Sequence, residues 1–134
     1  MILVFGSLNA DLFFNVTGLP APGETVLCPK YNFRPGGKGA NQAVAAASFG
    51  EQVEMIGSVG NDVFASPVIE ALKKSGVGVS CISQRPGTTG TACVMVEKGG
   101  ENQIVVASGA NLETISGQVD DNWLNEDTIL LLQM

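Results

Sequence analysis

The glycine-rich run Gly36-Gly37-Lys38-Gly39 constrains this chain more than any other feature, because an alanine-rich segment follows it directly. Residues 38–50 combine alanines with a final glycine, a pattern that predicts a helix and its stop. Glycines let the backbone approach a ligand closely, and a helix N-terminus offers N–H groups to electronegative atoms. The pattern therefore indicates a loop that holds a polar ligand, such as sugar hydroxyls or a phosphate.

The loop matches neither of two common nucleotide-binding motifs. Gly39 follows Lys38 where a P-loop has Ser or Thr for magnesium, and the upstream glycine spacing of a P-loop is absent. The spacing also differs from that of the dinucleotide-binding fingerprint. An ordinary glycine-rich turn before a helix is the alternative at this point.

Polar residues follow the first predicted strand. Residues 2–5 are apolar and rich in branched side chains, which predicts a core strand in a sheet covered on both faces. Asn9 and Asp11 come next, and in open α/β sheets ligands bind beyond the carboxyl ends of the strands. Alternate side chains face the same way, so an amide and a carboxylate could together hold vicinal hydroxyls. A solvated Asx turn is the alternative.

Four β-rich segments predict a separate small sheet. Residues 11–17 and 25–33 are joined by a turn rich in proline and glycine. Residues 89–97 and 102–107 are joined by a polar turn that contains glycine, which is typical of a hairpin. The hairpin would complete the sheet begun by the first two segments.

The remaining segments alternate between strand and helix signals. Residues 52–57 and 77–83 predict strands, and Asn61-Asp62 offers an N-cap for a helix that ends at Lys74. Short helices are expected within residues 112–124. Together with the small sheet, this order predicts an α/β fold.

The last segment, residues 128–134, has the apolar content of a central buried strand. No helix follows it to cover that strand, so we expect sequence beyond it.

Composition excludes several classes of function. The formal net charge is -6 with only 7 Lys and Arg, so we expect neither a nucleic acid nor a membrane as partner. The three cysteines form no closely spaced pair, which favours a reducing, cytoplasmic setting. The chain contains no histidine, which excludes Ser-His-Asp and Cys-His catalysis and a zinc site that needs His. Carboxylates, lysine, asparagine and backbone dipoles are left to carry chemistry.

The motifs and their order resemble the ribokinase-like, or PfkB, carbohydrate kinase family over the whole chain. The segments that carry this resemblance are Gly6-Ser7-Leu8-Asn9-Ala10-Asp11, Leu19-Pro20-Ala21-Pro22-Gly23-Glu24-Thr25, Gly36-Gly37-Lys38-Gly39-Ala40-Asn41-Gln42-Ala43, Gly57-Ser58-Val59-Gly60-Asn61-Asp62-Val63-Phe64 and Gly109-Ala110-Asn111. The resemblance implies that residues 1–134 are the N-terminal part of one ribokinase-like domain, a central mostly parallel sheet with helices. A small β-sheet lid, with strands at approximately 11–33 and 89–107, would be inserted in it.

The resemblance also implies a sugar pocket between lid and domain. Asn9 and Asp11 would bind sugar hydroxyls, and the same pocket would be lined by Gly37, Lys38 and Asn41. Apolar contacts over the sugar would come from the lid residues Ala92 and Val94. In this family the lid is also often a dimer interface, so we expect a homodimer.

The implied reaction is ATP-dependent phosphorylation of D-ribose or a similar pentose at its terminal hydroxyl. ATP and Mg²⁺, with a monovalent cation as a further candidate, would belong to the whole enzyme, and we expect none of them on this chain. The catalytic Gly-Ala-Gly-Asp motif of the family does not occur in the 134 residues. We therefore expect an inactive fragment of a kinase; the alternative is a non-catalytic module for sugar binding or dimerisation.

Overall fold

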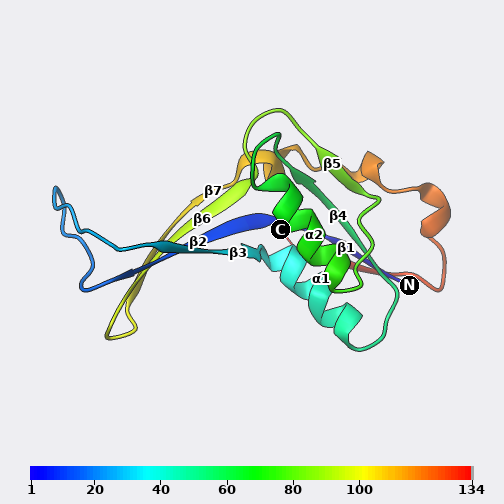
Figure 1. Cartoon of the computed structure of the whole chain (residues 1–134). Helices are drawn as coiled ribbons and strands as arrows, with labels where there is room; N and C mark the ends of the chain where they lie inside the picture. The colour runs from blue at the N-terminus through cyan, green and yellow to red at the C-terminus, as the bar shows by residue number, and fades with distance from the viewer. Residues whose placement is uncertain (134) are drawn as a thin grey trace.

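The computed structural model describes residues 1–133 and contains two four-stranded sheets (Figure 1). The first sheet has the order β5-β4-β1-β8, and all its pairs are parallel. Its strands are β1 (Ile2–Phe5), β4 (Val53–Val59), β5 (Ile82–Gln84) and β8 (Ile129–Leu132). The second sheet has the order β3-β2-β6-β7, with strands β2 (Asn9–Val16), β3 (Tyr31–Gly36), β6 (Gly90–Glu97) and β7 (Asn102–Ala107). The predicted α/β class is confirmed.

Two helices, α1 (Lys38–Ser48) and α2 (Ala65–Lys74), lie on one face of the parallel sheet (Figure 1). Because side chains alternate along a strand, Val4 and Met55 point to this face and are fully buried there. Leu3 and Ile56 point to the opposite face and pack against Trp123. That face is bordered by three 3₁₀ turns, η1 (Gly109–Glu113), η2 (Ser116–Gln118) and η3 (Asp121–Trp123). The last two lie within the range predicted for short helices, whereas η1 begins before it.

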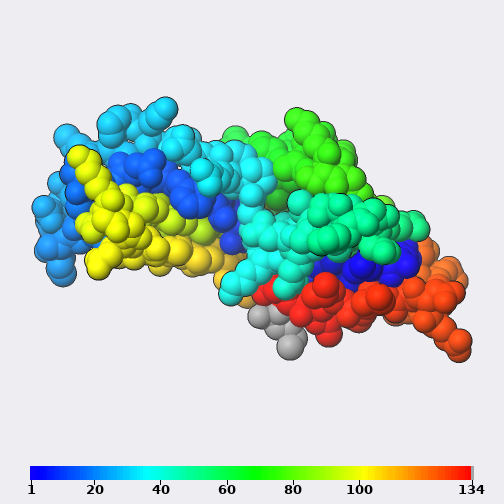
Figure 2. Space-filling model, turned by 90° about the horizontal axis from the view of Figure 1, so that it is seen from below, coloured from blue at the N-terminus to red at the C-terminus, as the bar shows by residue number. Residues whose placement is uncertain are grey.

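The second sheet extends away from the helices and the parallel sheet as a separate arm (Figures 1 and 2). We call it the projecting sheet. Its central strand β2 pairs parallel with β6 and antiparallel with β3. The register sets Asp11 opposite Ala92, so the two side chains leave the same face of the sheet. The predicted hairpin of β6 and β7 is confirmed, and β7 has the predicted bounds.

Several predicted strands are shifted by one or two residues at an end, and two differ more strongly from their predicted bounds. The strand expected over residues 25–33 begins only at Tyr31 and continues to Gly36, because Pro29 has no N–H to donate to a ladder. Pro35 is tolerated inside β3 because that strand lies at the edge of its sheet. The strand expected over residues 77–83 is reduced to β5. The N–H groups of Ser80 and Cys81 donate to the Glu54 carboxylate and not to the backbone carbonyls of a neighbouring strand.

The last strand differs from the prediction of a central buried strand. Strand β8 lies at the edge of the described sheet, next to β1 alone. Its side chains are accordingly half exposed, with 62% of Ile129 and 56% of Leu132 open to solvent. Met134, the end of the predicted strand, lies outside the described residues.

Helix α2 begins at Ala65 with Phe64 as its N-cap, later than the N-cap predicted at Asn61-Asp62, and Asp62 instead caps the turn that leads into the helix. Its Oδ1 accepts hydrogen bonds from the N–H groups of Phe64 and Ala65, at 3.1 and 3.2 Å. Both carboxylate oxygens also bind Thr89, which is fully buried at the start of β6. Burial opposes ionisation of Asp62, but these hydrogen bonds outweigh it and hold its pKa below the ordinary value of 3.8.

Substituting Asp62→Ala is therefore expected to lower the free energy of unfolding by about 2 kcal/mol, since both the cap of the turn before α2 and the partners of a buried threonine are lost. A lowered folded pKa means that this stabilisation is present above pH 3.8 and disappears as the pH falls through the folded pKa. Urea denaturation at pH 7 and below pH 3.8 measures both effects. The exposed Asp127→Ala is the matched control, and an equal loss in the two variants would contradict the prediction.

Candidate functional site

The candidate site forms where β1 ends, β2 begins and α1 starts. Helix α1 approaches this junction so closely that a Cβ on Gly39 would lie 2.7 Å from Gly6 Cα and from Ser7 N. Ser7 binds the start of the helix: its Oγ accepts from Lys38 N at 3.1 Å, and its carbonyl accepts from Ala40 N at 3.1 Å. Two of the helix N–H groups expected to face a ligand are thus already bound within the chain.

The double glycine of the loop is required by two different neighbours. Gly37 has a φ of +99°, and a Cβ there would collide with the Ser7 carbonyl and lie 2.9 Å from Asn9 N. At Gly36 a Cβ would lie 2.7 Å from Cγ of Asp11. The glycines therefore allow the loop to pack directly on the backbone of Asn9 and on the carboxylate of Asp11.

Asp11 carries the least satisfied carboxylate oxygen of the site. Its Oδ1 has almost no solvent-accessible surface and no hydrogen-bond partner among the described residues. Arg34, its neighbour across the strand pair, lies over the Phe13 ring at 4.9 Å from the centroid. Burial raises the pKa of Asp11 above its ordinary value. An unpaired buried acceptor is costly, and a ligand hydroxyl would relieve that cost.

Asn9 supplies the complementary donor. Its Oδ1 accepts from Nδ2 of Asn111 at 2.9 Å, which leaves its own amide hydrogens for another partner. Asn9 and Asp11 are two residues apart on β2 and so share one face. The arrangement presents a donor beside an acceptor, the pair of groups that vicinal hydroxyls can bind.

The other predicted residues lie on β6 and at the start of α1. Ala92 and Val94 are buried on β6, opposite Asp11 and Phe13 of β2. Lys38 is exposed at the first turn of α1. The structure therefore brings the backbone of Gly37 against Asn9 and sets Ala92 beside Asp11, while Val94 lies two residues farther along the projecting sheet.

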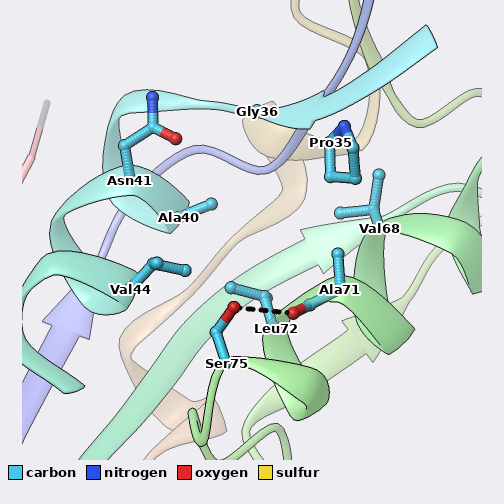
Figure 3. Close-up of a pocket in the computed structure, with 9 residues that line it drawn as sticks. All are labelled: Pro35, Gly36, Ala40, Asn41, Val44, Val68, Ala71, Leu72 and Ser75. Carbon is cyan, nitrogen blue, oxygen red and sulfur yellow. Dashed lines mark hydrogen bonds between the residues drawn. The ribbon is translucent and has the colours of Figure 1, made fainter. Parts of the chain in front are cut away.

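Asn41 belongs to the first turn of α1, like Lys38. It lines a pocket of about 240 Å³ between α1, α2 and the end of β3, in which Val44, Val68 and Leu72 are the apolar walls (Figure 3). Its carboxamide points away from Leu72 and Ser75 in that view.

Sequence reasoning missed the roles of three residues that hold the site together. The Oε1 atom of Gln133 accepts from Ser7 N at 3.0 Å and Ser7 Oγ at 2.7 Å, just beyond β8. Asn111 binds Leu8 and Asn9, and Thr89 binds Gly60 N. Gln133 could have been found by the rule that led to Asn9, because it too follows the carboxyl end of a parallel strand.

Other classes of site are not evident in residues 1–133. That part of the chain has no group of three or more His, Cys, Asp or Glu side chains able to hold a metal ion. None of its helices is long and apolar enough to cross a membrane. Its three cysteines, Cys28, Cys81 and Cys93, are free thiols.

Comparison with known families decides what kind of protein this is. The sequence profile of the pfkB family carbohydrate kinases matches residues 1–133. The chain belongs to the pfkB carbohydrate kinase family. The resemblance inferred from the motifs is thereby confirmed.

Curated pfkB relatives of the chain are ribokinases. Ribokinase of Bacillus subtilis is 44% identical over 111 residues, which are 82% of this chain and 38% of that protein. Ribokinase of Lactococcus lactis is 36% identical over 135 residues, covering 98% of this chain and 45% of that protein. The chain thus spans about two fifths of the length of the pfkB relatives that it matches.

Solved structures show the same pfkB fold. The ribokinase of Thermotoga maritima superposes with a TM-score of 0.87 at 38% identity, covering 97% of this chain and 43% of that one. The ribokinase of Cryptococcus neoformans, solved in complex with ADP, gives a TM-score of 0.84 at 39% identity. The superposition covers 98% of this chain and 40% of the Cryptococcus neoformans ribokinase, so this chain contains part of the ribokinase-like fold.

Proposed function

We propose that this chain is the sugar-binding part of an ATP-dependent carbohydrate kinase that phosphorylates D-ribose or a similar pentose at its terminal hydroxyl. The observation that carries the proposal is the buried, unpartnered Oδ1 of Asp11 next to the free amide hydrogens of Asn9. A pentose offers vicinal hydroxyls that satisfy both groups at once. The Bacillus subtilis and Lactococcus lactis relatives are both ribokinases, which supports ribose as the sugar.

In this proposal the projecting sheet is the lid of the pocket. Asn9 and Asp11 bind the sugar from the root of the lid, and the double-glycine loop with Gly37, Lys38 and Asn41 faces them. Ala92 and Val94 form its apolar cover. The buried, small side chain of Ala92 directly beside Asp11 supports this arrangement, because it leaves room for a ring over the carboxylate.

The outer face of the lid is proposed to pair with a second copy. Tyr31 and Val105 lie on the face opposite to Asp11, by the register of the four strands, and are 55% and 66% exposed. Exposed aromatic and branched side chains on one sheet face are typical of a protein interface. The free thiols support a reducing, cytoplasmic setting for the dimer.

Phosphoryl transfer is assigned to the remainder of the kinase domain. The Gly-Ala-Gly-Asp motif, which carries the catalytic aspartate in this family, does not occur in the sequence. The part described here binds and orients the sugar. With D-ribose and ATP, the chain alone is expected to consume no ATP, and measured turnover would contradict the proposal.

Ribose binding by the chain tests the proposal directly. Titration with D-ribose, followed by amide NMR shifts, is expected to perturb Asn9, Asp11, Gly37 and Ala92 first. Asn9→Ala is expected to weaken binding about fivefold or more, the effect of one lost hydrogen bond. The matched control Asn102→Ala lies at the exposed start of β7 and should bind as the wild type does. Shifts confined to other surfaces would contradict the proposed pocket.

A further inference from the structure

The Asn111 side chain binds the segment that joins β1 to β2. Its Oδ1 accepts from Leu8 N at 2.8 Å, and its Nδ2 donates to Leu8 O at 3.2 Å. The same Nδ2 donates to Asn9 Oδ1 at 2.9 Å. One carboxamide therefore binds the backbone between β1 and β2 and the side chain that begins β2, from 102 residues away.

The orientation of both carboxamides follows from their partners. A backbone N–H can only donate and a carbonyl can only accept, so Leu8 fixes which end of the Asn111 amide is oxygen. The Nδ2 of Asn111 then requires an acceptor, which fixes the oxygen end of the Asn9 amide toward it. The amide nitrogen of Asn9 is left pointing elsewhere, with both hydrogens free.

Gly90 provides the space for this pair. A Cβ at Gly90 would lie 2.8 Å from Leu8 O, 2.5 Å from Asn9 Oδ1 and still closer to Asn111 Nδ2. Gly90 is the residue of β6 that pairs with Asn9 of β2. The glycine at the base of the hairpin thus leaves room for the two hydrogen-bonded amides where a side chain would otherwise lie.

The next turn holds Asn111 in place. Ala110 of η1 is 2% exposed and donates its N–H to Thr88 O at 2.8 Å. This bond ties the turn that follows β7 to the segment that precedes β6. Asn111 N itself donates to Ser108 O at 3.2 Å. Its side chain therefore projects from a rigid 3₁₀ turn, which makes it suited to fix a neighbour.

We infer that Asn111 is a positioning residue that orients the Asn9 carboxamide so that its amide hydrogens, and not its oxygen, face the sugar. The inference rests on the proposed sugar site. Asp11 already offers a buried acceptor two residues away, so an acceptor at Asn9 would duplicate it, whereas a donor complements it. In this inference Asn111 acts on the sugar through Asn9, and its bonds to Leu8 hold its own carboxamide in place.

A double-mutant cycle on ribose affinity tests this. Asn111→Ala in the 134-residue chain is expected to weaken D-ribose binding by about as much as Asn9→Ala does, about fivefold, but less than about twofold in an Asn9→Ala background. Additive losses in the double variant would overturn the inference, because a merely structural role of Asn111 does not depend on Asn9. Asn111→Asp, which keeps the acceptor for Leu8 N, separates a lost orientation from a lost fold and should also weaken binding. Asn102→Asp is the matched control for the added charge.

A second readout needs no sugar. Both side-chain N–H groups of Asn111 are bonded, so their hydrogen exchange is expected to be at least about tenfold slower than that of the exposed Asn102 amide. The Asn9 amide hydrogens should exchange fast. Equal exchange at Asn111 and Asn102 would overturn the inference. If the chain binds no ribose yet Asn111 exchanges slowly and Asn9 fast, the proposed function fails while the orientation stands.

Discussion

Replacing Gly37 by alanine is expected to lower the free energy of unfolding by about 4 kcal/mol, the sum of a strained backbone and an overpacked contact. The φ of +99° at Gly37 is one that L-residues rarely adopt. The added methyl group would also meet the Ser7 carbonyl and Asn9 N. Both are backbone atoms of the β1–β2 junction, so a change of side-chain rotamer cannot relieve the contact. Denaturant unfolding, compared at an unchanged m-value, measures the loss.

Gly18→Ala is the matched control for this substitution. A Cβ at Gly18 would have no atom within 4 Å, and its φ is not positive, so the change is expected to stay within about 0.5 kcal/mol of the wild type. A similar midpoint for both variants would show that the double-glycine loop does not pack against Ser7 and Asn9. Loss of stability at Gly37 alone would support the close approach on which the candidate site depends.

Elements with a regular local pattern could be predicted from the sequence, and elements decided by distant partners could not. The bounds predicted for strand β7 are the observed ones because a glycine-containing turn and a run of branched residues define it locally. The strand expected over residues 77–83 shortened because Glu54, 26 residues before Ser80, takes the backbone N–H groups that a ladder would use. No periodicity within that segment signals such a competitor.

The same division holds for the candidate site. Asn9 and Asp11 could be found because they follow the carboxyl end of a strand. Gly37 could be found because few other residues adopt the backbone conformations of a tight loop. The contact of Asn111 with Asn9 bridges 102 residues, and that of Gln133 with Ser7 bridges 126. The family resemblance marked the position of Asn111 without its role, since only the folded chain shows which backbone groups the carboxamide meets.

Asp11→Asn is expected to separate sugar binding from stability. The substitution removes the carboxylate that accepts from the sugar, and a lost charged hydrogen bond weakens binding about tenfold or more. It also removes an unpaired charge whose burial raises the pKa of Asp11 above 3.8, so the variant is expected to be more stable than the wild type at pH 7. A residue that costs stability and is kept without a partner in the chain is typical of a binding site.

The pH dependence gives this prediction a sign that can be checked. Because the folded pKa is raised, ionised Asp11 destabilises the fold above that pKa, and the penalty vanishes below pH 3.8, where the carboxyl is protonated in both states. The gain in unfolding free energy of Asp11→Asn should therefore be present at pH 7 and absent below pH 3.8. As the pH is lowered, the ribose affinity of the wild type should fall, with a midpoint above pH 3.8. The control Asp127→Asn should change neither the unfolding free energy nor the ribose affinity. A destabilised Asp11→Asn variant at pH 7 would mean that the carboxylate has a partner in the chain and is not reserved for a ligand.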